Sequence, residues 1–162
     1  MRFNETDGKG RHDMRMDTKY FGEVDIVSTS IIHFPTGVLG FQQETEFVLL
    51  DFPNPSIFQI LQSTKSKETA FIVINPYHMY PDYTFKLDES TVQALQLIDE
   101  SDIMVLSIVT LKEPFKDSTM NLQAPIIINA SKLSGKQFVI NTNEYMTRAP
   151  ITISDPLMAK GE

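Results

Sequence analysis

The sequence predicts a mostly-β domain, an antiparallel barrel or sandwich of about nine or ten short strands with one short helix. Short runs rich in β-branched and aromatic residues recur along the chain, and turn residues such as Gly, Pro and Asn separate them. Only the stretch after Asp88 carries the signals of a helix start. Parallel strands would need a crossover helix for each pair, so the strands are expected to be antiparallel.

The first half of the chain contains five expected strands. They are predicted at residues 20–26, 31–34, 47–52, 57–62 and 70–74. Gly22 lies at the centre of the first, where a glycine often marks a bulge. Each of the others ends at a stretch rich in turn residues, such as residues 35–37.

A further strand and the helix are expected next. Residues 83–87 alternate between apolar and polar side chains, which predicts a strand. The helix is predicted at residues 89–96, with Asp88 as its N-cap and acidic side chains in its first turn. Val92 and Leu95 share one face of this helix because they are three residues apart.

The last third of the chain predicts a central strand and two more strands. Residues 103–111 are almost wholly apolar, as is typical of a strand that is covered on both faces. The two others are expected at residues 123–129 and 137–140, with a turn at Ser134 and Gly135 between them.

The chain divides into three parts in this interpretation. Residues 1–15 resemble a flexible leader or an extension outside the domain, residues 16–150 form the β domain, and residues 151–162 form a C-terminal tail. The 162 residues suffice for one domain with its own core. The N-terminus lacks the apolar stretch of a secretory signal, and no apolar run is long enough to span a membrane. We therefore expect a cytoplasmic protein.

Catalytic and metal-binding patterns are scarce. The chain has no cysteine, and its three histidines, His12, His33 and His78, are isolated from one another. No phosphate-binding, dinucleotide-binding, zinc-protease or nucleophile-elbow motif is present. We therefore predict no catalytic residue, no metal site and no cofactor, and we expect a protein that is not an enzyme.

The net charge of −7 indicates the kind of partner. Phosphate recognition requires a stripe of basic side chains, and none is visible, so direct binding to nucleic acid is not expected. Residues 82–102 contain six carboxylates and one lysine, which is −5 of the total. This segment is either a solvated rim or a recognition surface. The candidate protein-binding residues are its acids and the neighbouring aromatics, namely Tyr80, Asp82, Tyr83, Phe85, Asp88, Glu89, Asp99, Glu100 and Asp102.

Several segments resemble those of the FliW family of bacterial flagellar assembly factors. They are DTKYFGE at residues 17–23, IHFPTGVLGF at 32–41, FIVINPY at 71–77 with Asp82-Tyr83, LKEPF at 111–115, TMNLQAPIIIN at 119–129 and GKQ at 135–137. Together they cover about residues 16–147 in the same order, and Asn-Leu-x-Ala-Pro-Ile is the most specific of them.

The resemblance implies a small, β-rich, non-enzymatic protein with two protein partners. FliW-type proteins bind CsrA, a dimeric RNA-binding regulator of translation, and they also bind flagellin. While FliW holds CsrA, flagellin mRNA is not repressed. When unsecreted flagellin accumulates it occupies FliW, and the released CsrA stops flagellin translation. We therefore expect CsrA and flagellin as partners, and neither a membrane nor a nucleic acid.

Two other functions remain open at this point. An antiparallel barrel could be a carrier that encloses a small apolar ligand, which would require a cavity. A hydrolase or lyase could assemble its site from distant residues, which would require buried acids or histidines in one cleft.

Overall fold

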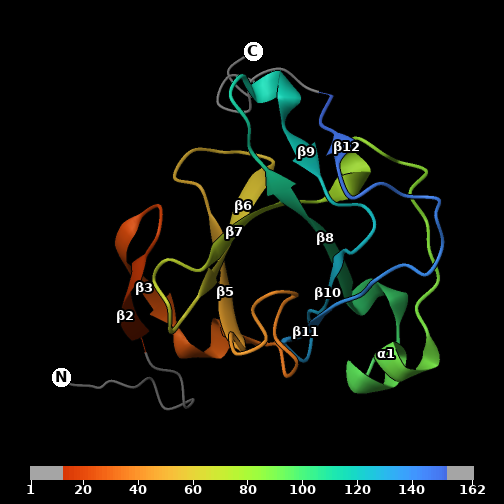
Figure 1. Ribbon diagram of the computed structural model, residues 1–162. Helices are drawn as coiled ribbons and strands as arrows, with labels where there is room; N and C mark the ends of the chain where they lie inside the picture. The colour runs from red at the N-terminus through yellow and green to blue at the C-terminus, as the bar shows by residue number, and fades with distance from the viewer. Residues whose placement is uncertain (1–12, 153–162) are drawn as a thin grey trace.

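The computed structural model describes residues 13–152, and the rest of the expected leader and tail lies outside the described residues. Seven strands close into a barrel (Figure 1), with the order β10–β11–β4–β5–β6–β7–β8 and a final pairing of β8 with β10. Neighbours are antiparallel except β11 and β4, which are parallel. The barrel strands are β4 (Ile32–His33), β5 (Glu46–Asp51), β6 (Phe58–Ser63), β7 (Ala70–Ile74), β8 (Ile103–Thr110), β10 (Ile126–Asn129) and β11 (Ser134–Gln137).

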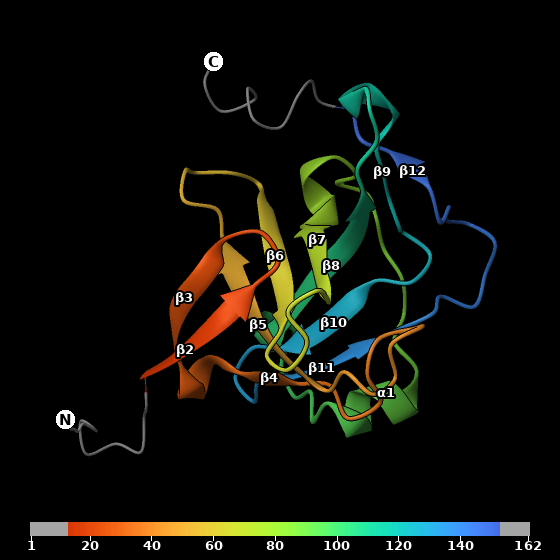
Figure 2. The same cartoon turned by 60° about the vertical axis from the view of Figure 1, so that its left-hand side comes forward.

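The remaining elements lie around this barrel. Strand β9 (Thr119–Met120) pairs with β8, and β12 (Ala149–Pro150) pairs with β9. Strands β2 (Asp13–Thr18) and β3 (Gly22–Val27) form a separate hairpin, which is prominent in Figure 2. The helix is α1 (Glu89–Ala94), and the 3₁₀ turns are η1 (Ser28–Ser30), η2 (Pro76–His78), η3 (Glu100–Asp102) and η4 (Phe115–Asp117). The prediction of a mostly-β fold with one short helix is confirmed, and the architecture is a barrel.

Side chains fill the interior of the barrel. One core cluster draws buried apolar residues from strands all around it, and only the inner face is common to those strands. Its largest members include Phe34, Phe47, Leu61, Ile126 and Ile128, each with almost no exposed surface. Phe34 and Phe47 meet edge to face at a centroid distance of 5.2 Å. The interior is therefore a packed core.

A second apolar cluster lies on the outside of β6, β7, β8 and β10. The outward side chains Ile74, Val109 and Ile127 pack there against residues of the long segments that follow β7 and β11, such as Tyr83 and Phe138. These segments cover one flank of the barrel (Figure 1). The candidate residues of the sequence analysis belong to this covering layer.

The β2–β3 hairpin covers the outside of β5. Met16 and Ile26 pack on Val48, and these three form the centre of a third apolar cluster. Residues 13–15, which the sequence assigned to the leader, form the first half of β2, so the ordered domain begins earlier than expected. Ile151, assigned to the tail, is likewise buried in the core cluster on the other flank.

The expected strand at residues 83–87 is absent, although its alternation is real. Tyr83 is buried and Phe85 is half-buried, whereas Thr84 and Lys86 face solvent. This extended segment packs through its apolar side chains but belongs to no sheet. The alternation reports which side chains face the core, and ladder pairing additionally requires a neighbouring strand.

Two glycines have roles other than those expected. Gly22 lies at the end of the β2–β3 turn with φ = +69°, a conformation that glycine adopts without strain, so the expected bulge was wrong. Gly135 lies inside β11, and a Cβ there would come within 2.6 Å of the Phe34 ring. The expected turn at Ser134 and Gly135 is therefore part of a strand, and Leu133 adopts the positive φ of 53° instead.

Candidate functional site

The candidate aromatic residues serve to attach the covering segments. Tyr83 is only 4% exposed, and its hydroxyl donates a hydrogen bond of 2.6 Å to the carbonyl oxygen of Leu122. Burial raises the pKa of the Tyr83 hydroxyl, so the group remains a donor. The Tyr80 hydroxyl donates to the carbonyl oxygen of Pro150 at 2.5 Å. Tyr83 thus connects the segment after β7 with the segment between β9 and β10, and Tyr80 connects it with β12.

Phe85 is part of the same layer. Its ring lies 5.2 Å from that of Tyr83 and stacks on Phe138 at 6.1 Å. Tyr145 adds a reciprocal connection, because its hydroxyl donates to the carbonyl oxygen of Thr84 at 2.7 Å and accepts from the Thr84 amide at 3.1 Å. The three candidate aromatics thus hold the covering segments together, and none of them is among the strongly exposed apolar side chains.

An open groove of about 640 Å³ lies where these covering segments meet. Asp82 and Glu144 are exposed and contribute to its lining, together with Met146, which is also exposed. The groove lies outside the barrel. Asp82 lines this groove, whereas the remaining candidate acids lie on and around α1 and η3.

Asp88 and Glu89 begin helix α1. The Asp88 carboxylate accepts a hydrogen bond of 2.9 Å from the Thr91 amide and thereby caps the helix, as predicted. Hydrogen bonds from Thr91 hold the pKa of Asp88 below its usual range, and nearby Lys136 lowers it further. Glu89 is exposed in the first turn, where a negative charge complements the helix dipole.

The other three acids surround the 3₁₀ turn η3. The Asp99 carboxylate accepts from the Ser101 amide at 3.1 Å, and the Asp102 carboxylate accepts from the Ser131 hydroxyl at 2.7 Å. Asp99 and Glu100 are exposed, whereas Asp102 is half-buried. Elements α1 and η3 lie together at one end of the barrel (Figure 1), so the structure brings five of the six candidate acids onto one end of the molecule.

Sequence reasoning missed an apolar residue in this region. Ile98 lies between α1 and η3 and is 91% exposed, the largest fraction among the exposed large apolar side chains of residues 13–152. Its neighbours differ, because Leu97 is half-buried and Leu95 is buried. Ile98 directly precedes the acids, but it follows Leu95 by three residues, the same spacing that separates Leu95 from Val92. The local pattern therefore gave no signal that Ile98 would be exposed. We use the term acidic face for Asp88, Glu89, Ile98, Asp99, Glu100 and Asp102.

A buried side chain fixes the position of this acidic face. Asn129, at the end of β10, donates to the carbonyl oxygens of Leu95 and Gln96 at 2.7 and 3.2 Å. Its own amide oxygen accepts from the backbone amides of Ser131 and Lys132. The C-terminal end of α1 is thereby attached to the barrel, so the face is a defined surface.

The chemistry of the described residues is limited. No group of three or more acids or histidines within residues 13–152 could hold a metal ion. Within the same residues, no helix combines the length and the apolar character that a membrane crossing requires. The acidic face can attract cations and bury Ile98 against a partner, and this is protein-recognition chemistry.

Comparisons with known proteins identify the relatives of this chain. The sequence profile of the family described as "FliW protein" matches residues 15–151. A protein named flagellar assembly factor FliW from Oceanobacillus iheyensis is 43% identical over 149 residues, which is 92% of this chain and all of that protein. The protein of the same name from Bacillus subtilis is 42% identical over 138 residues, covering 85% of this chain and 96% of that one.

A solved structure supports the same assignment. The crystal structure of the flagellar assembly factor FliW superposes with a TM-score of 0.80 and 38% sequence identity. The match covers 86% of this chain and 100% of the crystallised chain. Profile, sequence identity and fold agree over nearly the whole described domain, and the chain therefore belongs to the FliW family.

Proposed function

We propose that this chain is a cytoplasmic, non-enzymatic flagellar assembly factor that binds the translational regulator CsrA and flagellin. By holding CsrA it keeps flagellin mRNA free of repression. Accumulating flagellin then occupies the protein and releases CsrA, so flagellin synthesis follows export. Membership of the FliW family supports this proposal. The exposure of Ile98 within the acidic face is the observation that assigns partner binding to particular residues.

The composition of the acidic face supports a basic protein partner. An exposed apolar anchor surrounded by charged side chains is the usual arrangement of an interface hot spot and its rim. A protein that binds RNA presents positive charge, and exposed Glu89, Asp99 and Glu100 complement such a surface. The aromatics Tyr80, Tyr83 and Phe85 contribute indirectly, because they hold the covering layer in place.

The alternative function, a small-ligand carrier, has less support. A carrier needs an enclosed apolar cavity, but buried side chains such as Phe34 and Phe47 occupy the barrel interior. The grooves found among the described residues are lined by segments on the outside of the barrel. A folded protein that binds no apolar fluorescent ligand but retains CsrA would agree with the proposed function.

The test is a titration of purified CsrA by calorimetry. Ile98→Ser is expected to weaken binding at least about tenfold, because a buried anchor contributes on the order of 2 kcal/mol or more. Leu111→Ser is the matched control, since Leu111 is also exposed, at 48%, but follows the end of β8 that is opposite to η3. Equal losses in the two variants, or none in Ile98→Ser, would place the CsrA interface elsewhere.

The acids of the face could attract CsrA or repel RNA from it, and one variant separates these roles. Asp99→Lys combined with Glu100→Lys is expected to slow association, and to do so less at high salt, if attraction dominates. If repulsion dominates, the double variant binds CsrA normally but no longer displaces flagellin leader RNA. A variant that binds and displaces like the unmodified protein would show that these two acids form only a solvated rim.

A further inference from the structure

Among residues 13–152, the β2–β3 hairpin is a small sheet whose outer edges pair with no further strand. Its two strands pair with each other over six residue positions and with no other strand of residues 13–152. The inner face is fixed on the barrel through Met16 and Ile26, so the opposite face is turned to solvent. An exposed, unpaired strand edge presents backbone donors and acceptors that can pair with another segment.

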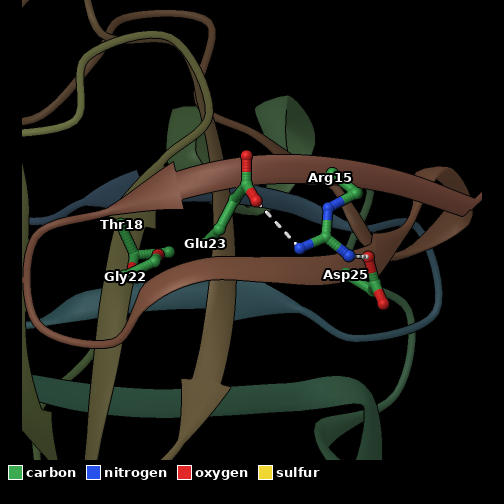
Figure 3. A network of polar contacts seen from close by, with 5 residues as sticks. All are labelled: Arg15, Thr18, Gly22, Glu23 and Asp25. Carbon is green, nitrogen blue, oxygen red and sulfur yellow. Dashed lines mark hydrogen bonds and ion pairs between the residues drawn. The ribbon is translucent and has the colours of Figure 1, made fainter.

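The hairpin is preorganised as a rigid strand pair. The Thr18 hydroxyl donates to the carbonyl oxygen of Gly22 at 2.7 Å (Figure 3). It also accepts from the Phe21 amide at 2.9 Å. The turn is also connected to the barrel, because the Lys19 amide donates to the side chain of Gln62. A partner strand that adds here meets an edge that is already extended, which lowers the entropic cost of binding.

The charges of the outer face select the partner. Asp17 lies directly opposite Glu23, a like-charge pair that destabilises neighbouring strands. Arg15 lies opposite Asp25, and Figure 3 shows its guanidinium contacting both Glu23 and Asp25, at 2.8 and 3.0 Å. One guanidinium thus contacts two carboxylates. The edge of β3 carries two of these acids and no cation, whereas β2 carries Arg15.

We propose that the open edge of β3 is a strand-addition site for an extended, basic segment of a partner protein. Lysine or arginine at alternate positions of such a segment would lie beside Glu23 and Asp25, while its backbone pairs with β3. A second copy of this chain is a poorer occupant, since two edges of this kind would bring the same acids together. This site lies on the hairpin and does not depend on the acidic face of α1 and η3.

The probe is a nine-residue peptide with lysine at alternate positions and valine or threonine between them. In titrations followed by amide NMR, shifts and slowed hydrogen exchange are expected in β3. The control peptide has the same charge but proline at two intervening positions, which removes backbone donors. Equal binding of the proline peptide, or shifts confined to α1 and η3, would overturn the proposal.

Variants on the two strands are expected to change the affinity in opposite directions. Glu23→Gln with Asp25→Asn should weaken peptide binding about five- to tenfold, since two cross-strand charge pairs are lost. Arg15→Gln should tighten it, because the internal cation that competes with the peptide is removed.

Matched controls leave the hairpin intact. Glu68→Gln with Glu144→Gln and, separately, Lys116→Gln make the same charge changes at exposed positions elsewhere and should leave the affinity within about twofold. Control variants that change the affinity as much as the hairpin variants would reduce the effect to net charge and overturn the proposal. CsrA binding is measured separately on the same variants. The proposed function and the strand-addition site are thereby tested by different readouts, and the failure of one does not decide the other.

Discussion

The side-chain amide of Asn129 donates a 2.7 Å hydrogen bond to the backbone carbonyl oxygen of Leu95 and so attaches the end of helix α1 to strand β10. Asn129 is 1% exposed and satisfies backbone groups of two segments, the carbonyl oxygens at the end of α1 and the amides of the turn after β10. The acidic face is therefore held by a buried amide of the barrel. Its geometry depends on a residue that touches no solvent.

Replacing this amide should destabilise the fold and loosen the acidic face. Asn129→Ala leaves buried carbonyl and amide groups without partners, which is expected to cost about 2–4 kcal/mol. Urea unfolding measures this loss, and Asn141→Ala is the control because Asn141 is exposed. If the two variants unfold at the same urea concentration, the Asn129 contacts add nothing to stability.

The Tyr83 hydroxyl is predicted to matter for stability and not for binding. Tyr83→Phe removes the donor to the Leu122 carbonyl in a buried site and should cost about 1–2 kcal/mol. CsrA affinity of the folded variant should be unchanged. Tyr20→Phe, at an exposed position, should leave both properties unchanged. A selective loss of CsrA binding in Tyr83→Phe would instead restore Tyr83 as an interface residue.

Two buried serines should respond in opposite ways to alanine. The Ser107 hydroxyl has no hydrogen-bond partner among the described residues, so Ser107→Ala should leave stability unchanged or raise it. The Ser63 hydroxyl donates to Glu44 at 2.6 Å and accepts from the amides of Lys65 and Ser66. Ser63→Ala should therefore be destabilising. Thermal melting of both variants checks the difference, and a larger loss for Ser107→Ala would contradict it.

The hydrogen bonds of Glu44 predict that the stability of the fold depends on pH. Hydrogen bonds from Ser63, then from Ser66 and Thr69, lower its pKa from the usual value of 4.5. Because the folded-state pKa is the lower one, the carboxylate stabilises the fold above the unfolded-state pKa, and this contribution is lost as the pH falls through the folded-state value.

The measurement is urea unfolding of the unmodified protein and Glu44→Gln between pH 7 and pH 3. The stability difference should be constant near neutrality and should shrink below about pH 4.5. Glu68→Gln, at an exposed position in the β6–β7 turn that supplies the Ser66 donor to Glu44, should show a much smaller difference. A difference that grows on acidification would have the wrong sign for this explanation.

Gly135 is predicted to be intolerant of a side chain. Its Cβ position lies within 2.6 Å of the Phe34 ring, which is fully buried in the barrel. Gly135→Ala should cost about 1–3 kcal/mol through displacement of that ring. Ser134→Ala, at the neighbouring half-buried position, is the control in the same unfolding assay. Equal stability of the two variants would show that the core accommodates the methyl group.

Local sequence patterns were sufficient to predict much of the secondary structure. The β-rich runs at β5, β6, β7 and β8 and the cap at Asp88 were predicted to within a residue or two. Such features depend on neighbours in the sequence, because alternation, turn residues and caps act over a few positions. The order of the resembling segments also identified the family correctly.

The pairing of distant segments had no comparable signal. Strands β9 and β12 have two residues each, and nothing in so short a run marks it as a strand before its partner is known. The barrel closes through the pairing of β8 with β10, and the local sequence of either strand does not indicate the other as its partner. Their hydrogen bonds depend on where the whole chain has folded.

By itself, the sequence determined the mostly-β class, the single capped helix, the concentration of acid in residues 82–102 and the family. Only the tertiary structure decided that Tyr83 is buried, that Ile98 is exposed among the acids and that β2 and β3 form an open acidic hairpin. The reason is physical. Composition sets which side chains are apolar or charged, but exposure is a property of the packed chain around them.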